Sequence, residues 1–123
     1  MTRRTERINE VLREELSELI SRELRDPRIG SIVSIVDIET QDDLRQAKVH
    51  VSVMGSPEEK KATIAALTSA SGWLHRSITK RLSMRSVPYL VFVLDETMER
   101  ADRIDRLIEQ AKQEDRTLHN DKP

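Results

Sequence analysis

Apolar residues recur with two different periods along the chain, and these periods predict its helices and strands. From residue 5 to residue 24 they recur every three or four positions, the period of an amphipathic helix. The apolar positions of this stretch are Ile8, Val11, Leu12, Leu16, Leu19, Ile20 and Leu24. Pro27 ends the helix, because the residue before a proline is pushed out of the helical region.

A β-hairpin is predicted after this helix. The stretch IGSIVSIVDIE, residues 29–39, is rich in β-branched residues, and in AKVHVSV, residues 47–53, every second residue is apolar. Such alternation is typical of a strand with one buried face. QDDL, residues 41–44, connects the two strands.

A second helix is predicted from Pro57 to Ala70. Ser56 is suited to cap it, Pro57 suits the first helical position, and Glu59 completes a capping box. Later in the chain, YLVFVLD, residues 89–95, is a short apolar run that predicts a third strand buried on both faces. Residues 97–113 show the helical period once more, and residues 114–123 are expected to form a flexible tail.

The order is therefore helix, strand, strand, helix, break, helix, strand, helix. It predicts the α+β class, with helices packed on a three-stranded sheet. The length of 123 residues suits a single domain.

Composition narrows the class of protein. The chain has no cysteine, so it can hold neither a disulfide framework nor a thiolate metal site. It has no apolar run long enough for a membrane span, and its N-terminus does not have the pattern of a signal peptide. We expect a soluble cytoplasmic protein.

The distribution of charge changes the picture that the net charge of −1 gives. Residues 60–94 contain six basic residues and no Asp or Glu, whereas residues 95–123 contain nine acidic residues and six basic ones. The difference in charge between these two segments is more informative than the net charge of the whole chain. The middle of the chain is thus a candidate surface for a polyanion.

Gly72 lies within this basic region, in the stretch SASGWLHRSITKRL, residues 69–82. A glycine inside a helix costs about 1 kcal/mol relative to alanine, so Gly72 indicates a kink or a break. If the helix resumes after it, Trp73, Arg76 and Lys80 fall on the side opposite an apolar stripe. An exposed aromatic ring beside two cations can stack on an unpaired base while the cations contact phosphate.

Two ordinary interpretations of these residues stay open. A tryptophan beside a kink often fills the bend as a buried wedge. A row of cations on a helix is more often a solvated surface than a binding site. The lack of acidic residues favours binding, because ordinary solvated helices mix charges of both signs.

The chain resembles ribosome-binding factor A, a family of small bacterial assembly factors for the small ribosomal subunit. The resemblance covers nearly all of the chain. It rests on DPRIG at residues 26–30, the hairpin DL..AKVHVSV, the ASG element at Ala70 to Gly72, and the run L.MR..P.L.F..D from Leu82 to Asp95.

The resemblance implies a fold similar to a type II KH domain, with the order α-β-β-α-kink-α-β and an added C-terminal helix. An AxG kink between two helices replaces the GxxG loop that clamps phosphates in other KH domains. Residues 1–113 are expected to form this single RNA-binding domain. The implied function is association with free or immature 30S subunits, help in late 16S rRNA processing and 30S maturation, and a role in cold adaptation.

The resemblance and the charge pattern of the chain together indicate which residues meet RNA. Ala70, Ser71 and Gly72 would bring the backbone close to 16S rRNA, and the basic helix after them would lie along phosphates. The expected contacts in and after that helix are Trp73, His75, Arg76, Lys80, Arg81 and Arg85. Arg4, Arg7 and Arg28, with Arg3, would add to them if the first helix lies nearby.

The sequence departs from the family pattern at two of its positions. His75 stands where the family commonly has an arginine, with Arg76 next to it. Tyr89 stands where the family often has an acidic residue.

No catalytic motif is present: the chain has neither a GxxxxGK[ST] phosphate loop nor a GxSxG elbow. We expect no enzyme activity, no cofactor, no metal site and a monomer whose partners are the small subunit and other assembly factors. One alternative is a protein-interaction or dimerisation module that uses the sheet edge or residues 98–111. Another is a small hydrolase or nuclease that uses Asp42 and Asp43, although Asp is common in turns.

Overall fold

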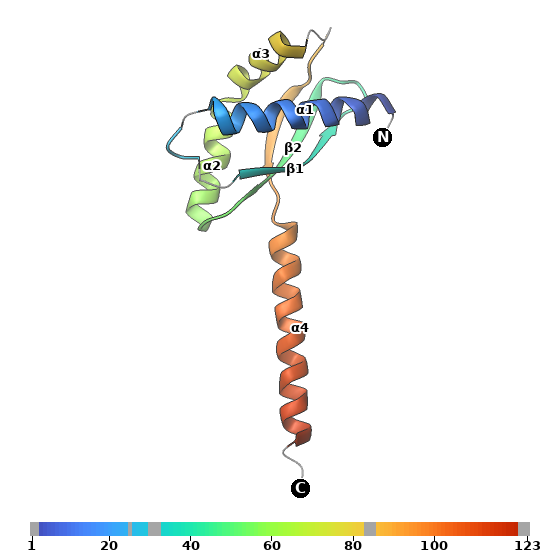
Figure 1. The fold of residues 1–123 in the computed structure, drawn as a ribbon, viewed down its shortest axis with the longest axis vertical. Coiled ribbons are helices and arrows are strands. Elements are labelled where there is room, and N and C mark those ends of the chain that lie inside the picture. The colour runs from blue at the N-terminus through green and yellow to red at the C-terminus, as the bar shows by residue number, and fades with distance from the viewer. Residues whose placement is uncertain (1–2, 25, 30–32, 83–85, 121–123) are drawn as a thin grey trace.

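The computed structural model describes residues 3–24, 26–29, 33–82 and 86–120, and the elements follow the predicted order (Figure 1). The elements are α1 (Arg3–Arg22), β1 (Val33–Thr40), β2 (Gln46–Val53), α2 (Pro57–Ser69), α3 (Ser71–Leu82), β3 (Tyr89–Leu94) and α4 (Thr97–Asn120). The predicted α+β class is confirmed.

The three strands form one mixed sheet in the order β1-β2-β3. β1 and β2 make the predicted antiparallel hairpin, with a register shift between Ile35 and Asp37. β3 lies parallel to β2, with Gln46 opposite Tyr89. A parallel pair needs a crossover connection, and α2 and α3 supply it.

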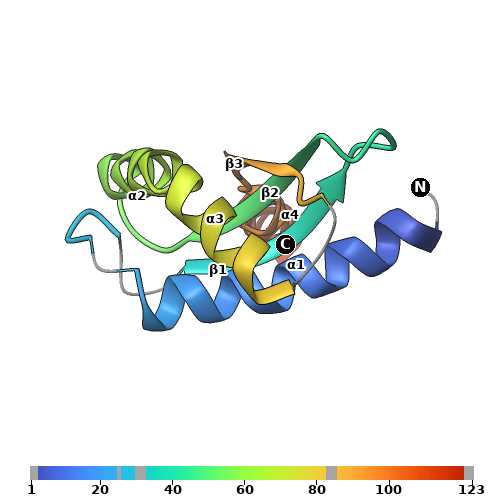
Figure 2. The ribbon, with the colours of Figure 1, turned by 90° about the horizontal axis from the view of Figure 1, so that it is seen from above.

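The core lies between one face of the sheet and three helices. α1 buries the apolar stripe that its sequence predicted, with Leu12, Leu16 and Leu19 fully buried. It packs on β1, while α2 and α3 pack on β3 (Figure 2). From the sheet, Val49 and Val51 of the central strand contribute to the same core.

β3 is buried on one face only, so the prediction of a strand buried on both faces was wrong. Leu90 and Phe92 point into the core, whereas Tyr89 and Val91 are exposed. The reason is that α1, α2 and α3 cover a single face of the sheet. On the other face, the exposed positions of β3 carry apolar and aromatic residues. The sequence of β3 therefore does not alternate between apolar and polar residues, although its burial alternates.

α4 projects away from the rest of the fold as a single helix (Figure 1). An ion pair between Lys60 and Glu99 holds its first turn against α2. Beyond that turn the described side chains are exposed, including the apolar Ile104, Leu107 and Ile108. The helix continues through Asn120, although a tail was predicted from residue 114; the flexibility of that segment and the domain boundary at residue 113 stay predictions.

Candidate nucleic-acid interface

α2 and α3 meet at a one-residue break, Ala70. α2 begins as predicted, because Ser56 Oγ accepts a hydrogen bond from the Glu59 backbone N–H at 3.1 Å and Pro57 occupies the first turn. At its other end, the Ala70 N–H still donates to the Ala66 carbonyl oxygen at 3.0 Å. The Ala70 carbonyl oxygen then accepts from the Leu74 N–H at 2.9 Å, which starts α3. The chain therefore changes direction without a loop.

Gly72 lies two residues after this break, in the first turn of α3, so the kink is not centred on Gly72 as the sequence suggested. Its backbone is not in the left-handed region, and an added Cβ would meet only the Nη1 atom of Arg76, at 3.4 Å. Neither its conformation nor its packing within the chain requires a glycine. The residue leaves the backbone at this turn open to an outside molecule.

The two faces of α3 have the predicted character. Leu74 and Ile78 are fully buried against the sheet. Trp73, Arg76 and Lys80 are exposed on the other side. Trp73 is 38% exposed, so it is not a buried wedge within the bend. An aromatic ring and two cations thus follow the open backbone of Gly72.

His75 connects α3 to the segment before β3. Its Nε2 atom lies 2.8 Å from the Val87 carbonyl oxygen. A carbonyl can only accept, so Nε2–H is the donor. The His75 ring also stacks on the Tyr89 ring, with 4.6 Å between the centroids. His75 therefore helps to fix the position of α3 on the sheet.

Arg81 turns toward α1 and lies among three carboxylates. Its guanidinium nitrogens lie 2.6 Å from Glu23, 3.4 Å from Glu15 and 3.8 Å from Glu18. These partners neutralise the charge that the sequence assigned to RNA binding. Arg81 thus differs from Arg76 and Lys80, for which the structure shows no ion pair among the described residues.

The predicted contacts on α1 and in the loop after it, Arg3, Arg4, Arg7 and Arg28, lie in two separate places. Arg3, Arg4 and Arg7 line an open hollow of about 800 Å³ that also reaches Ser86, just before β3. Arg28 lies beyond the other end of α1, where its carbonyl oxygen accepts a hydrogen bond from Thr63 Oγ1 at 3.1 Å. Arg85, the remaining predicted contact, lies outside the described residues.

The Arg28 side chain is held by Asp26. Its Nε and Nη2 atoms donate to the two carboxylate oxygens, the shorter distance being 2.8 Å. Hydrogen bonds from the side chain and then the backbone of Arg28 hold the pKa of Asp26 below its usual value. The Arg28 side chain is thereby paired with a carboxylate of its own segment.

The paired aspartates of the hairpin show turn geometry. Asp43 Oδ1 accepts a hydrogen bond from the Arg45 backbone N–H at 3.0 Å. Leu44, between these two residues, has a positive φ of 62°. Within the part of the chain that the structure describes, no group of three or more His, Asp or Glu side chains could hold a metal ion. In the same part, none of the helices is long and apolar enough for a membrane span.

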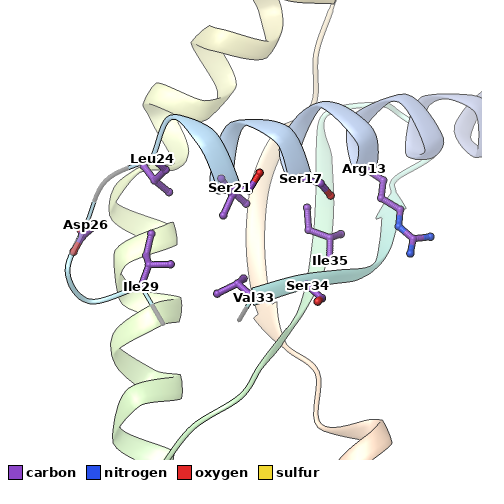
Figure 3. Close-up of a pocket in the computed structure, with 10 residues that line it drawn as sticks. Arg13, Ser17, Ser21, Leu24, Asp26, Ile29, Val33, Ser34 and Ile35 are labelled. Carbon is purple, nitrogen blue, oxygen red and sulfur yellow. The ribbon is translucent and has the colours of Figure 1, made fainter. Parts of the chain in front are cut away.

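A second concave site lies between α1 and β1, and sequence reasoning did not predict it (Figure 3). This groove has a volume of about 620 Å³. Leu24, Ile29 and Val33 provide apolar walls, and Arg13 and Ser17 lie at its α1 side. None of its described lining residues belongs to α2 or α3, so it is distinct from the surface around Gly72.

Comparison with known proteins identifies the family of the chain. The model of the family described as "Ribosome-binding factor A" matches residues 4–108. A ribosome-binding factor A from Caldanaerobacter subterraneus is 41% identical over 115 residues, which cover 94% of each chain.

A crystal structure and a fitted homology model show the same fold. The crystal structure of ribosome-binding factor A from Thermus thermophilus has a TM-score of 0.56 at 22% identity, covering 73% of this chain and 89% of that one. A homology model of the Thermus thermophilus factor, fitted into a cryo-EM map of its complex with the 30S subunit, has a TM-score of 0.58 at 21% identity. That likeness covers 78% of this chain and 96% of the other.

The fold is therefore KH-like, as the resemblance implied. The family match spans most of the chain, from the start of α1 into α4. The chain belongs to the ribosome-binding factor A family.

Proposed function

We propose that this protein binds free or immature 30S subunits through 16S rRNA and assists late 16S rRNA processing and 30S maturation in the cytoplasm, without catalysing a reaction. Family membership supports the ribosomal partner, because the related Thermus thermophilus factor was fitted into a 30S complex. The observation that carries the RNA contact is the outward face of α3. There the open backbone of Gly72 is followed by exposed Trp73, Arg76 and Lys80.

Phosphate is the RNA group that this face suits best. The first N–H groups of a helix have no carbonyl partner within it and carry a partial positive charge. In α3 these are the amides of Ser71, Gly72 and Trp73, and the missing side chain of Gly72 lets a phosphate approach them. One helical turn further on, Arg76 adds a full charge on the same face.

Further phosphates meet cations outside α3. The contact set that we propose comprises Arg76 and Lys80, together with Arg85 and the arginines of α1 that line the open hollow. Arg28 is paired with Asp26 and contributes less to RNA binding. Arg81 is neutralised by Glu15 and Glu18 of α1 and by Glu23, which follows it. Residues 60–94 include no Asp or Glu side chain, so this segment does little to repel the RNA phosphates.

The salt dependence of binding tests this proposal. If four or five phosphates are engaged, log K should fall with log salt at a slope of roughly −3 to −4, a loss of about a hundredfold for a fourfold rise in salt. The affinity is measured for purified small subunits over a range of KCl concentrations. An affinity that does not change with salt would contradict the proposal.

Sucrose-gradient sedimentation of a cell extract tests the partner independently. The protein should travel with free small subunits and be absent from translating ribosomes. A protein that stays at the top of the gradient at low salt would not be a small-subunit factor.

The exposed apolar residues of α4 favour a second candidate, a protein-interaction or dimerisation module. Ile104, Leu107 and Ile108 are each about half exposed or more. In this case the protein would self-associate tightly and would not sediment with ribosomal particles. Analytical ultracentrifugation distinguishes the two candidates, because the RNA-binding factor is expected to be a monomer.

A further inference from the structure

Tyr89 and His75 form a rigid pair of stacked rings where α3 meets β3. Their ring planes are inclined by only 16°, and their centroids are 4.6 Å apart. The His75 ring is held by its hydrogen bond to the Val87 carbonyl oxygen at 2.8 Å. On the other side, the Tyr89 backbone N–H donates to the Arg45 carbonyl oxygen at 2.9 Å. The stack and the His75 hydrogen bond therefore position the two rings against each other, and the backbone bond anchors Tyr89 at the start of β3.

The second face of the Tyr89 ring is free. His75 covers one face, yet the residue is still 69% exposed, the largest exposed fraction among the large hydrophobic residues of the described chain. An aromatic ring already held in place loses little conformational entropy when it binds. Such a ring accepts a flat partner on its open face, and in single-stranded RNA the unstacked bases are flat partners.

The two elements that carry this ring pair also have a basic residue close by in the chain or in the sheet register. On α3, His75 follows Gly72 by three residues and precedes Arg76 directly, so the ring pair lies within one turn of the proposed phosphate site. On the sheet, Gln46 lies opposite Tyr89 and Lys48 lies opposite Val91. Lys48 is thus the diagonal neighbour of Tyr89 on the uncovered face, and it is exposed.

We propose that the free face of Tyr89 stacks on an unpaired base of an RNA strand whose phosphates pass Gly72 and Arg76. The inference rests on the proposed function and specifies its ligand, since a base within a duplex is already stacked on its neighbours. It makes Tyr89 a residue that selects single-stranded over double-stranded RNA. Stacking is tolerant of base identity, so the preference concerns strandedness more than sequence.

Proton NMR can observe this contact directly, because Tyr89 is the one tyrosine of the chain. A short single-stranded RNA of mixed sequence is titrated into the protein. The Tyr89 ring protons should shift upfield as a base stacks on them. The same strand annealed to its complement should leave them in place. Equal shifts with both forms would overturn the proposal.

Affinity measurements on variants give a second test. Tyr89→Ser should weaken binding to the single-stranded RNA and to purified small subunits by about 5- to 140-fold, the range for one base stack. Tyr89→Phe should bind like the wild type. The matched control is Val91→Ser, two residues along the same strand on the same exposed face, and it should change neither affinity. Melting temperatures of all variants show that they are folded.

The salt slope separates failure of this inference from failure of the proposed function. Tyr89→Ser removes no charge, so its slope should equal that of the wild type. If Tyr89→Ser binds as tightly as the wild type and the wild type keeps its slope, the stack is wrong and the proposed function stands. If Tyr89→Ser weakens only subunit binding, Tyr89 meets a ribosomal protein and the stack is again wrong. If the wild type binds neither RNA nor subunits, both proposals fail.

Discussion

Arg81 and Glu23 form an ion pair with a distance of 2.6 Å, and this pair joins the last turn of α3 to the residue that follows α1. Glu15 and Glu18 lie on the same side of the guanidinium. One of the cations of α3 thus serves to position the helix, while Arg76 and Lys80 remain exposed. A charge that is already neutralised displaces few counterions when RNA binds.

Arg76 and Arg81 should therefore respond differently to the same substitution. Arg76→Gln should reduce the magnitude of the salt slope of small-subunit binding by about 0.7 to 0.9, the contribution of one phosphate contact. Arg81→Gln should leave the slope unchanged and lower the free energy of unfolding by about 0.5 to 1 kcal/mol, since the pairs are partly exposed. Urea unfolding and KCl-dependent binding provide the two measurements. Equal changes of slope would show that Arg81 also contacts phosphate.

Substitution of Gly72 should change stability and binding in opposite directions. Gly72→Ala should raise the free energy of unfolding by about 0.5 to 1 kcal/mol, because the site is helical and a Cβ meets only the flexible end of Arg76. The same methyl group would keep a phosphate from the backbone and weaken subunit binding by about tenfold, the loss of one hydrogen bond to a charged group.

Ser17→Ala is the matched control for Gly72→Ala. Ser17 is an exposed position within α1, so the change should also raise helix stability, by a smaller amount, without altering affinity. If Gly72→Ala binds as tightly as the wild type, the open backbone at this turn has no role in RNA recognition.

Asn9 fastens the edge strand β1 to α1. Its Oδ1 atom accepts hydrogen bonds from the Thr40 backbone N–H at 3.1 Å and from Thr40 Oγ1 at 2.5 Å. Thr40 is buried, so Asn9→Ala should cost about 1 to 3 kcal/mol by leaving these donors without an acceptor. Asn9→Asp keeps an acceptor oxygen at this position, now part of a carboxylate, and should cost less. Urea denaturation compares the two, and equal losses would assign the effect of Asn9 to packing.

Stability should depend on pH through Asp95, which precedes α4. Hydrogen bonds from the Thr97 side chain and backbone, and then the charges of His50 and Arg100, hold the pKa of Asp95 below its usual value. A carboxylate with a lowered pKa in the folded state stabilises the fold above its unfolded pKa of about 4. That contribution is lost as the pH falls through the folded-state pKa.

Urea unfolding of the wild type and of Asp95→Asn at several pH values measures the contribution of the Asp95 charge to stability. The wild type should be the more stable protein at pH 6, and the difference should shrink as the pH falls below about 4. Asp105→Asn, at an exposed position along α4, is the control, and its free energy of unfolding should equal that of the wild type at each pH. A difference that is constant from pH 6 to pH 2 would mean that the charge of Asp95 does not stabilise the fold.

Local patterns were sufficient to predict most elements of the fold. The helical period in α1, the alternation in β2 and the cap at Ser56 each depend on residues a few positions apart, and the structure confirms all three. β3 was misjudged because exposed and buried positions there are both apolar or aromatic. Its burial depends on which face of the sheet the helices cover, and no pattern within six residues records that.

The candidate site was predictable where it depends on one helix. The exposure of Arg76 and Lys80 follows from helical spacing relative to Leu74 and Ile78. The neutralisation of Arg81 was not predictable, because Glu23 lies 58 residues away in the sequence. Tyr89 gains its fixed ring from His75 in the same way, through a contact between two elements.

Trp73 gives this protein a built-in optical reporter. It is the one tryptophan of the chain, it is 38% exposed, and it lies three residues after the helix break. Light absorbed at the red edge of the protein spectrum therefore excites a single ring at the junction of α2 and α3. The wavelength and lifetime of its emission monitor solvent access at that junction alone, without an attached label.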